Sequence, residues 1–123
     1  MKKKTQGQIE AEISEAIIKF EKEYMGRGPK ETKTYIIDDM IFVRLKGVLT
    51  PAEEQLTKTD DGSELIKKTR VSLLEGAWVL LENIVFDITG RKIQSLHSDI
   101  STKTGERVII FTLDKGFEKN FDN

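Results

Sequence analysis

Two pairs of short alternating runs, each pair meeting at a tight turn, constrain the fold of this chain more than any other feature. The runs cover residues 32–38 and 40–46 in the first pair and residues 92–101 and 106–113 in the second. They are rich in β-branched and aromatic residues. The turns, Asp38-Asp39 and Thr102-Lys103-Thr104-Gly105, hold residue types that tolerate tight-turn backbone. The sequence therefore predicts two β-hairpins.

An amphipathic helix is predicted before the first hairpin. Thr5 and Gln8 have the spacing of a capping box, so the helix should begin near Gln6. Its apolar residues recur at three- and four-residue steps and form one stripe: Ile9, Ile13, Ala16, Ile17, Phe20 and Tyr24. The charged residues between them, Glu21 included, are expected on the solvent side. The helix should end at Gly26-Arg27-Gly28-Pro29, because glycine favours a left-handed C-cap and proline cannot continue a helix.

A second capping box opens the helical half of the chain. Thr50 and Glu53 have the spacing of the box, and Pro51 lies at the first helical position, where its missing amide hydrogen is not needed. We expect this helix to be short. Asp61 with Glu64 is the expected cap of the helix that follows.

The following helix is expected to run without a break to Thr89 and to end at Gly90. Its apolar residues form two overlapping stripes, which together are too wide to be buried on one sheet face. Because a second apolar stripe is usually covered by another chain, we expect a homodimer interface on this helix. The candidate interface residues are Val71, Leu74, Trp78, Val85 and Phe86.

These elements follow the order α-β-β-α-α-β-β and indicate an α+β fold. The natural arrangement is one antiparallel sheet made of both hairpins, with the N-terminal helix and the long central helix packed on one face. A chain of 123 residues fits a single domain spanning residues 1–123. We expect an ordered core over about residues 6–114 and a flexible tail over residues 115–123.

Composition narrows the class of protein. The formal net charge of −1 gives no overall field that would attract nucleic acid, so no nucleic-acid partner is expected. The absence of cysteine excludes disulfides and thiolate chemistry and favours a cytoplasmic location. Charged and polar residues interrupt the apolar stretch 77–88, so we expect no direct membrane insertion. The lysines at the N-terminus precede no apolar stretch, so export is not expected.

The polar segment from His97 to Glu106 contains the only histidine and is the first candidate site. On an extended strand, Ser95, His97, Asp99 and Ser101 would project from one face. Side chains two residues apart on a strand point in parallel, so a base and a nucleophile would not converge on one carbonyl. We therefore expect no catalytic residues, no cofactor and no enzymatic activity.

Several interpretations of this segment stay open. A divalent-metal site would use His97, Asp99 and Glu106, but without a symmetry mate it lacks a third clear nitrogen or carboxylate ligand. An alkali-cation site would use oxygens of Asp99, Ser101, Thr102 and Thr104. An anion site would use Lys103, Arg107 and the amides around Gly105. The simplest interpretation is structural, with His97 hydrogen-bonded and Asp99 accepting from turn amides.

Three motifs carry a resemblance to a known family. They are Gly26-Arg27-Gly28-Pro29, the segment Gly47–Glu53 and the segment His97–Glu106, within a match that extends from about Gln8 to Asp114. In these motifs the chain resembles the MpsC family, named after a component of a sodium-translocating, membrane-potential-generating system.

The resemblance implies a soluble auxiliary component that works beside membrane subunits linked to sodium or inorganic-carbon transport. It supplies no catalytic residues. The candidates for contact with a ligand or partner are the polar residues in or beside its motifs: Arg27, Thr50, His97, Ser98, Asp99, Ser101, Thr104 and Glu106.

The leading hypothesis is accordingly a cytoplasmic, non-enzymatic accessory or regulatory protein. It would form a homodimer and reach the membrane only through a transporter subunit. The alternative is a small-ligand or ion-binding protein that uses the His97–Glu106 hairpin. Neither the ion nor the partner can be named from the residues.

Overall fold

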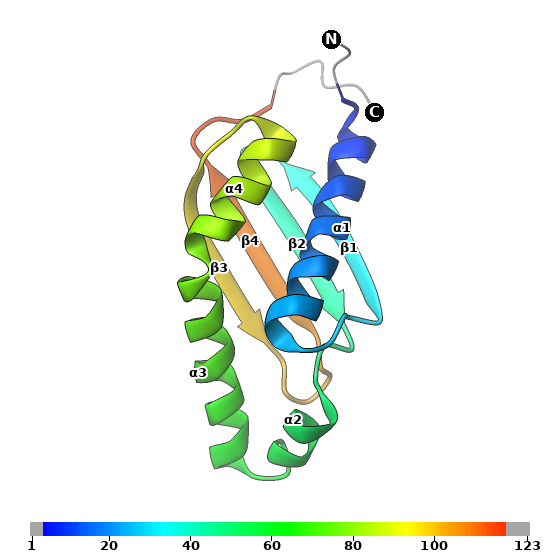
Figure 1. The fold of residues 1–123 in the computed structure, drawn as a ribbon, viewed down its shortest axis with the longest axis vertical. Helices are drawn as coiled ribbons and strands as arrows, with labels where there is room; N and C mark the ends of the chain where they lie inside the picture. Colours follow the sequence, from blue (N-terminus) through cyan, green and yellow to red (C-terminus); the bar gives the residue numbers. More distant parts are fainter. Residues whose placement is uncertain (1–3, 118–123) are drawn as a thin grey trace.

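A computed structural model describes residues 4–117 and shows one four-stranded antiparallel sheet. Its strands are β1 (Glu31–Ile37), β2 (Met40–Lys46), β3 (Ile93–Ile100) and β4 (Arg107–Leu113). Both predicted hairpins form, and they join through β2 and β4, giving the strand order β1-β2-β4-β3 (Figure 1). The predicted α+β class is therefore confirmed.

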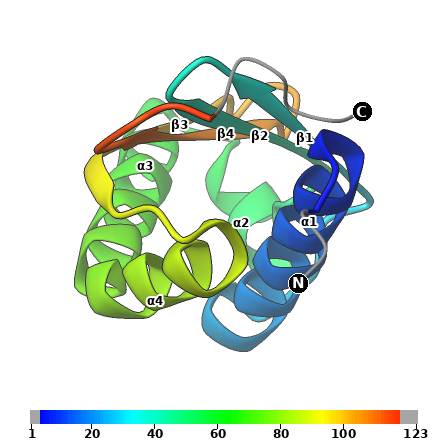
Figure 2. The same cartoon turned by 90° about the horizontal axis from the view of Figure 1, so that it is seen from above.

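The helices lie on one face of the sheet (Figure 2). They are α1 (Gln6–Met25), α2 (Pro51–Leu56), α3 (Asp60–Gly76) and α4 (Trp78–Thr89). Both predicted capping boxes are present: the Thr5 hydroxyl accepts from the Gln8 amide, and the Thr50 hydroxyl accepts from the Glu53 amide. The predicted starts of these two helices, at Gln6 and Pro51, are therefore confirmed.

The long central helix is not continuous, which corrects the prediction. Ala77 leaves helical geometry at φ −95° and ψ 14°, so α3 ends at Gly76 and α4 begins at Trp78. Glycine lowers helix propensity at this point. The break allows α3 to pack beside β3 while α4 packs against α1, an arrangement that one straight helix would not reach.

The start of α3 also differs from the prediction. Thr59, and not Asp61, is the N-cap, and its hydroxyl accepts from the Gly62 amide at 3.0 Å. Gly62 lies so close to the preceding helix that a Cβ atom there would come within 2.0 Å of the Leu56 carbonyl oxygen. The α2–α3 turn therefore requires glycine at this position.

The hydrophobic core lies between the inner face of the sheet and the helices. Alternate strand residues point inward, and the α1 stripe packs over β1 and β2. Fully buried members include Ile13, Ile17, Ile41, Val43, Leu81, Val85, Ile109 and Phe111. Among residues 4–117, no helix covers the opposite face of the sheet (Figure 2).

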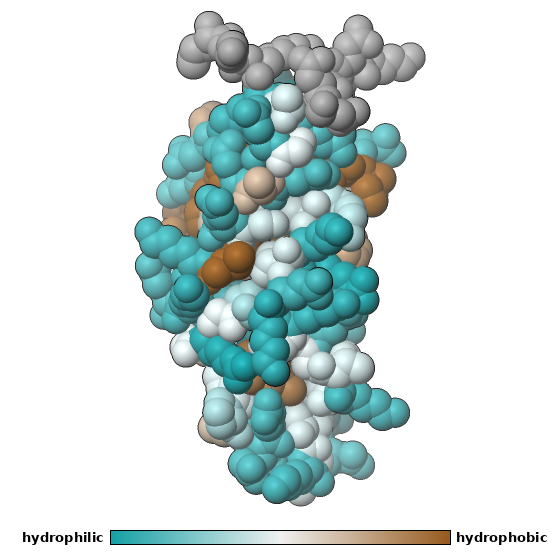
Figure 3. Space-filling model, turned by 90° about the vertical axis from the view of Figure 1, so that its right-hand side faces the viewer, coloured by the Kyte–Doolittle hydropathy of each residue, from teal (hydrophilic) through white to brown (hydrophobic). Residues whose placement is uncertain are grey.

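The side that carries α1 and β1 is mainly hydrophilic, with small separate hydrophobic areas (Figure 3). The predicted flexible tail falls mostly on residues 118–123, which lie outside the described residues. At the end of the described chain, the Arg91 guanidinium lies 4.4 Å from the centre of the Phe117 ring. This cation–π contact places residue 117 against the start of β3.

Candidate functional site

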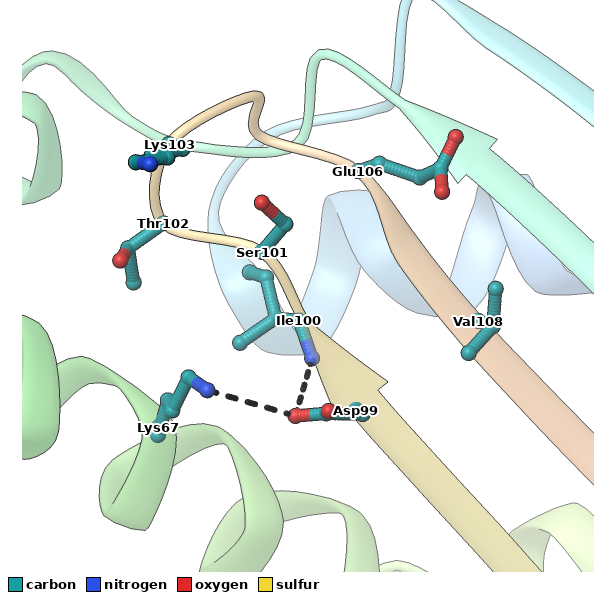
Figure 4. A pocket seen from close by; sticks show the side chains of 8 residues that line it. All are labelled: Lys67, Asp99, Ile100, Ser101, Thr102, Lys103, Glu106 and Val108. Carbon is teal, nitrogen blue, oxygen red and sulfur yellow. Dashed lines mark hydrogen bonds and ion pairs between the residues drawn. The ribbon is translucent and has the colours of Figure 1, made fainter.

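The His97–Glu106 segment forms one wall of a pocket at the end of the sheet where β3 turns into β4 (Figure 4). The pocket has a volume of about 470 Å³, and α3 forms its other side through Lys67. We call it the hairpin pocket. Its lining residues are Lys67, Asp99, Ile100, Ser101, Thr102, Lys103, Glu106 and Val108.

The turn itself is held by its own backbone and hydroxyl groups. The Ser101 amide donates to the Glu106 carbonyl at 2.8 Å, and the Gly105 amide donates to the Ser101 carbonyl at 2.8 Å. Gly105 has φ 75°, a left-handed conformation that disfavours a side chain. The Thr104 hydroxyl accepts from the Glu106 amide at 3.3 Å. This wall of the pocket is thus a turn closed by its own hydrogen bonds, which hold its polar side chains in fixed positions.

Both carboxylates of the pocket have cationic partners. Asp99 lies 3.8 Å from the Lys67 ammonium and accepts from the Ile100 amide at 2.8 Å. Glu106 pairs with Arg44 at 2.7 Å, and this carboxylate raises the pKa of the Arg44 guanidinium. Lys103 has no hydrogen-bond or ion-pair partner among the described residues. Lys103, with the hydroxyls of the turn, is therefore the group best placed to meet a ligand.

The structure brings together some of the predicted site residues and separates others. Asp99, Ser101 and Glu106 line the pocket, whereas His97 is exposed on the open face of the sheet opposite Ile110. Ser98 points to the other side of β3, toward the helices. Ser95, His97 and Asp99 share the open face, as the strand alternation predicts.

Arg27 and Thr50 lie away from the pocket, at the start of α2. The Arg27 guanidinium donates to the Leu49 carbonyl at 3.1 Å, and Thr50 acts as the N-cap of α2. Their contacts hold the loop before α2 to the end of α1. Neither lines the hairpin pocket.

Two of the open interpretations are not supported. The described residues contain no group of three or more histidine, cysteine, aspartate or glutamate side chains that could hold a metal ion, so His97, Asp99 and Glu106 do not form a metal site. Arg107 does not serve an exposed anion site, because its side chain is only 1% exposed and points into the interior.

Arg107 instead belongs to a cluster of charges buried beneath the pocket. Its guanidinium lies 3.0 Å from the Glu21 carboxylate, which is fully buried. Arg70 lies 3.5 Å from Glu21 and holds Glu53 through two bonds of 2.6 and 2.9 Å. It also donates to the Val48 carbonyl at 3.0 Å. This buried charge cluster joins α1, α2, α3 and β4.

Burial sets the electrostatics of the buried charge cluster. It raises the pKa of Glu21, and the neighbouring Arg107 and Arg70 offset that effect only in part. Burial also lowers the pKa of Arg107, again against the opposing influence of Glu21. Burial acts to raise the pKa of Glu53 as well, but the hydrogen bonds from Arg70 and the Thr50 backbone outweigh it, so the pKa of Glu53 is lowered.

The buried placement of Glu21 corrects the expectation that it faces solvent, and Arg70 is a buried charge that the sequence analysis did not identify. A signal was present in each case, because Glu21 follows Ile17 by four residues and Arg70 lies midway between Ile66 and Leu74 at the same spacing. A charged residue at a position of the apolar period is a candidate for a buried ion pair.

The predicted helix interface also needs correction. Leu74 is 2% exposed and Val85 is fully buried, so neither is available to another chain. The break at Ala77 turns both residues into the core. Val71 and Phe86 are exposed, Trp78 is half-buried, and their role in an interface stays a prediction.

Fold and site together define a small α+β protein in which a broad antiparallel sheet carries a polar pocket at one end. The chain belongs to the MpsC family: residues 5–115 match the family described as "Na+-translocating membrane potential-generating system (MpsC)". This confirms the resemblance seen in the sequence motifs.

Two relatives from Bacillus subtilis (strain 168) match over nearly their whole length. The uncharacterized protein YbcI is 48% identical over 120 residues, which covers 98% of this chain and 97% of the relative. The uncharacterized protein YrhF is 27% identical over 109 residues, covering 88% of this chain and 89% of the relative. No solved structure matches the chain. Within residues 4–117, none of the helices has the length and apolar character needed to cross a bilayer.

Proposed function

We propose that this protein is a non-enzymatic accessory component of a membrane-potential-generating sodium system, located in the cytoplasm and held at the membrane by a partner subunit. The family match over residues 5–115 carries the proposal, because the family description names such a system. In this proposal the protein acts by binding, and the ion path belongs to the partner.

The hairpin pocket is the proposed contact with the transport partner. It unites three predicted residues, Asp99, Ser101 and Glu106, with two lysines from the turn and from α3. Its groups of both charges lie at one end of the molecule, far along the sheet from the start of α1 (Figure 1). A polar loop of the partner would find donors and acceptors there.

Affinity capture in the native bacterium tests the accessory role. Tagged wild type, Lys103→Glu and the control Lys68→Glu would be purified after gentle solubilisation, and copurifying proteins identified by mass spectrometry. Lys68 is exposed on α3 next to Lys67 but does not line the pocket. We expect a membrane-embedded ion-transport subunit with the wild type and the control, and its loss with Lys103→Glu.

Recovery of this protein alone with the wild type would contradict the accessory role. Recovery of the same transport subunit with all three proteins would retain the role but move the contact away from the pocket.

Lys103 and the hydroxyls in the hairpin pocket favour a second candidate function, the binding of a small anion such as bicarbonate. The space of about 470 Å³ is ample for such an ion. Asp99 and Glu106 already have cationic partners, which leaves Lys103 and the hydroxyls of Ser101 and Thr102 to meet an anion.

Calorimetry with matched salts tests the second candidate. Titration with sodium bicarbonate, potassium bicarbonate, sodium chloride and potassium chloride separates the anion from the cation. Heat with both bicarbonates and neither chloride, lost in Lys103→Ala, is the expected result. Heat with both sodium salts and neither potassium salt would instead identify an alkali-cation site, and no heat at all would remove the ligand-binding function.

A homodimer is part of the proposed function. The exposed apolar side chains on the helices, such as Val71 and Phe86, and those on the open sheet face, Tyr35 and Ile37, support it, because contiguous exposed apolar patches often mark protein interfaces. Light scattering of the full chain across a range of concentrations tests this proposal, and a monomer at every concentration would contradict it.

A further inference from the structure

The face of the sheet that carries no helix is unusually apolar at its centre. In residues 4–117 no helix or strand covers this face (Figure 2). Ile37 and Tyr35 are 49% and 40% exposed, and Phe42 and Ile110 beside them are half-buried. Antiparallel sheets commonly place polar side chains on a solvated face. The centre of this face therefore offers an apolar surface to a partner, with charged side chains beside it.

Strand register arranges these side chains in rows that cross all four strands. The central row is Tyr35, Phe42, Ile110 and His97, and Tyr35 and Phe42 meet edge to face with ring centres 6.4 Å apart. The next row toward the hairpin pocket is Lys33, Arg44, Val108 and Asp99. The second row is basic at the β1 edge and acidic at the β3 edge.

We infer that two copies of this chain pair through their open sheet faces, related by a two-fold axis that runs parallel to the strands between β2 and β4. This inference rests on the proposed homodimer and moves its interface from the helices to the sheet. Such an axis places β1 of one copy over β3 of the other. Lys33 then faces the partner's Asp99 at both ends of the row, and Phe42 faces the partner's Ile110. The Asp99 side chain is 75% exposed and its contact with Lys67 is long, at 3.8 Å, so its carboxylate can accept a second cation.

Charge complementarity selects this axis over the alternative. A two-fold axis across the strands would lay the charged row over the row of Ile37 and Met40, burying Arg44 and Lys33 against apolar side chains. The axis parallel to the strands keeps the central row on itself and joins Lys33 to the partner's Asp99. Only Arg44 then lies over an apolar side chain, the partner's Val108, and it keeps its ion pair with Glu106 of its own chain. Aligned sheet packing of this kind is the ordinary geometry of β-sandwiches.

The size of the face predicts a weak dimer. Four strands about 4.8 Å apart, with seven residues at about 3.4 Å each, give a footprint of roughly 450 Å² per copy. The two faces together, about 900 Å², fall below the roughly 1,200–2,000 Å² that stable specific interfaces bury in total and in the range of weak, transient complexes. We therefore expect a dimer that dissociates in the micromolar range of protein concentration.

A charge swap between copies tests the inference. Lys33→Glu would place glutamate opposite the partner's Asp99, and Asp99→Lys would place lysine opposite the partner's Lys33, so each variant alone should be monomeric. An equimolar mixture should dimerise again, because each end of the row then joins opposite charges. Sedimentation velocity of the full chain over about 1–200 μM, the range in which weak specific complexes dissociate, measures all three samples and the Lys68→Glu control.

The outcomes separate the two proposals. The sheet interface would be supported if each variant alone is monomeric and the two variants bind each other in the mixture at least tenfold more tightly than either binds itself. A wild-type dimer that survives in both single variants would overturn the sheet interface and leave the homodimer; loss of that dimer in Phe86→Ser would place it on α4. A monomeric wild type at every concentration would overturn both.

Discussion

Glu21 is the residue whose surroundings are most sensitive to a change of charge. It has no exposed surface, and its carboxylate lies between Arg107 at 3.0 Å and Arg70 at 3.5 Å. Replacing it with glutamine keeps the shape but leaves the buried Arg107 without a carboxylate partner and Arg70 with Glu53 alone. Removing one partner of a buried ion pair costs about 3–5 kcal/mol.

We therefore expect Glu21→Gln to lower the free energy of unfolding by about 3 kcal/mol or more at neutral pH, as measured by urea denaturation. The cost of leaving Arg107 buried and unpaired should exceed the relief from no longer burying an ionised carboxylate, the effect that raises the pKa of Glu21. Glu23→Gln is the matched control, because Glu23 lies on the same helix and is exposed. A change of less than about 1 kcal/mol in Glu21→Gln, the size of a surface pair, would show that the cluster contributes little to stability.

Glu53 gives the pH dependence of the same cluster. Its pKa is lowered in the folded protein, so its contribution to stability is present above the ordinary carboxylate pKa and is lost as the pH falls through the lowered value. Glu53→Gln keeps the capping-box residue type at the third helical position but removes the ion pair with Arg70.

We expect Glu53→Gln to be less stable than the wild type by about 2 kcal/mol at pH 7, the size of hydrogen bonds to charged groups. The difference should shrink as the pH falls toward about 3, below the ordinary carboxylate pKa. Urea unfolding across this pH range measures it, with exposed Glu54→Gln as the control. A difference that stays constant with pH would show that ionised Glu53 is not the stabilising form.

At the scale of secondary structure elements, glycines 62 and 76 have opposite roles although both lie in α3. A Cβ at Gly62 would meet the Leu56 carbonyl carbon and oxygen, which are backbone atoms and cannot move without shifting the α2–α3 turn. A Cβ at Gly76 would meet nothing within 4 Å. Gly62→Ala should therefore disturb the fold, whereas Gly76→Ala should only favour helix.

Thermal or urea unfolding of both variants checks this expectation. Gly62→Ala should lose about 2 kcal/mol or more through overpacking against backbone. Gly76→Ala should gain about 0.5–1 kcal/mol, the usual difference between glycine and alanine in a helix. Loss of stability in Gly76→Ala would mean that the break before α4 needs glycine for a reason other than space.

Elements marked by local signals were predictable from the sequence, and those set by tertiary packing were not. The caps at Thr5 and Thr50 and the turn at Asp38-Asp39 depend on side chains within a few residues, and all appear in the structure. The break at Ala77 depends on how α3 and α4 pack against β3 and α1, which local spacing does not reveal. Lys67 joins the hairpin pocket for the same reason, because α3 is brought beside a turn more than thirty residues later in the chain.

At the scale of the whole molecule, the buried charge cluster and the hairpin pocket lie on opposite sides of the same strand ends. Arg107, whose Cα pairs with that of Ile100, points inward to Glu21, while Asp99 and Val108 point outward to the pocket and the open face. The cluster therefore holds the end of the sheet against three helices. A rigid interior at this end would keep the pocket and the charged row of the open face in fixed positions relative to each other.

Pairing through the open face should couple stability to protein concentration. A partner that binds only the folded chain stabilises it by mass action, by about 1.4 kcal/mol when its free concentration is tenfold above the dissociation constant. For a domain of this size, that stabilisation corresponds to an increase of about 5 °C in the unfolding midpoint. We expect this increase for the wild type between roughly 1 and 100 μM, the concentrations that bracket a weak dimer.

Differential scanning calorimetry at low and high protein concentration measures this shift. Lys33→Glu should unfold at the same temperature at both concentrations, because this variant does not bind a second copy and is not stabilised by it. The Lys68→Glu control should behave as the wild type does, because residue 68 lies on α3 and away from the open sheet face. If the unfolding midpoint of the wild type does not depend on protein concentration, two copies do not cover each other's apolar face. Its row of Tyr35, Phe42 and Ile110 would then contact a different partner.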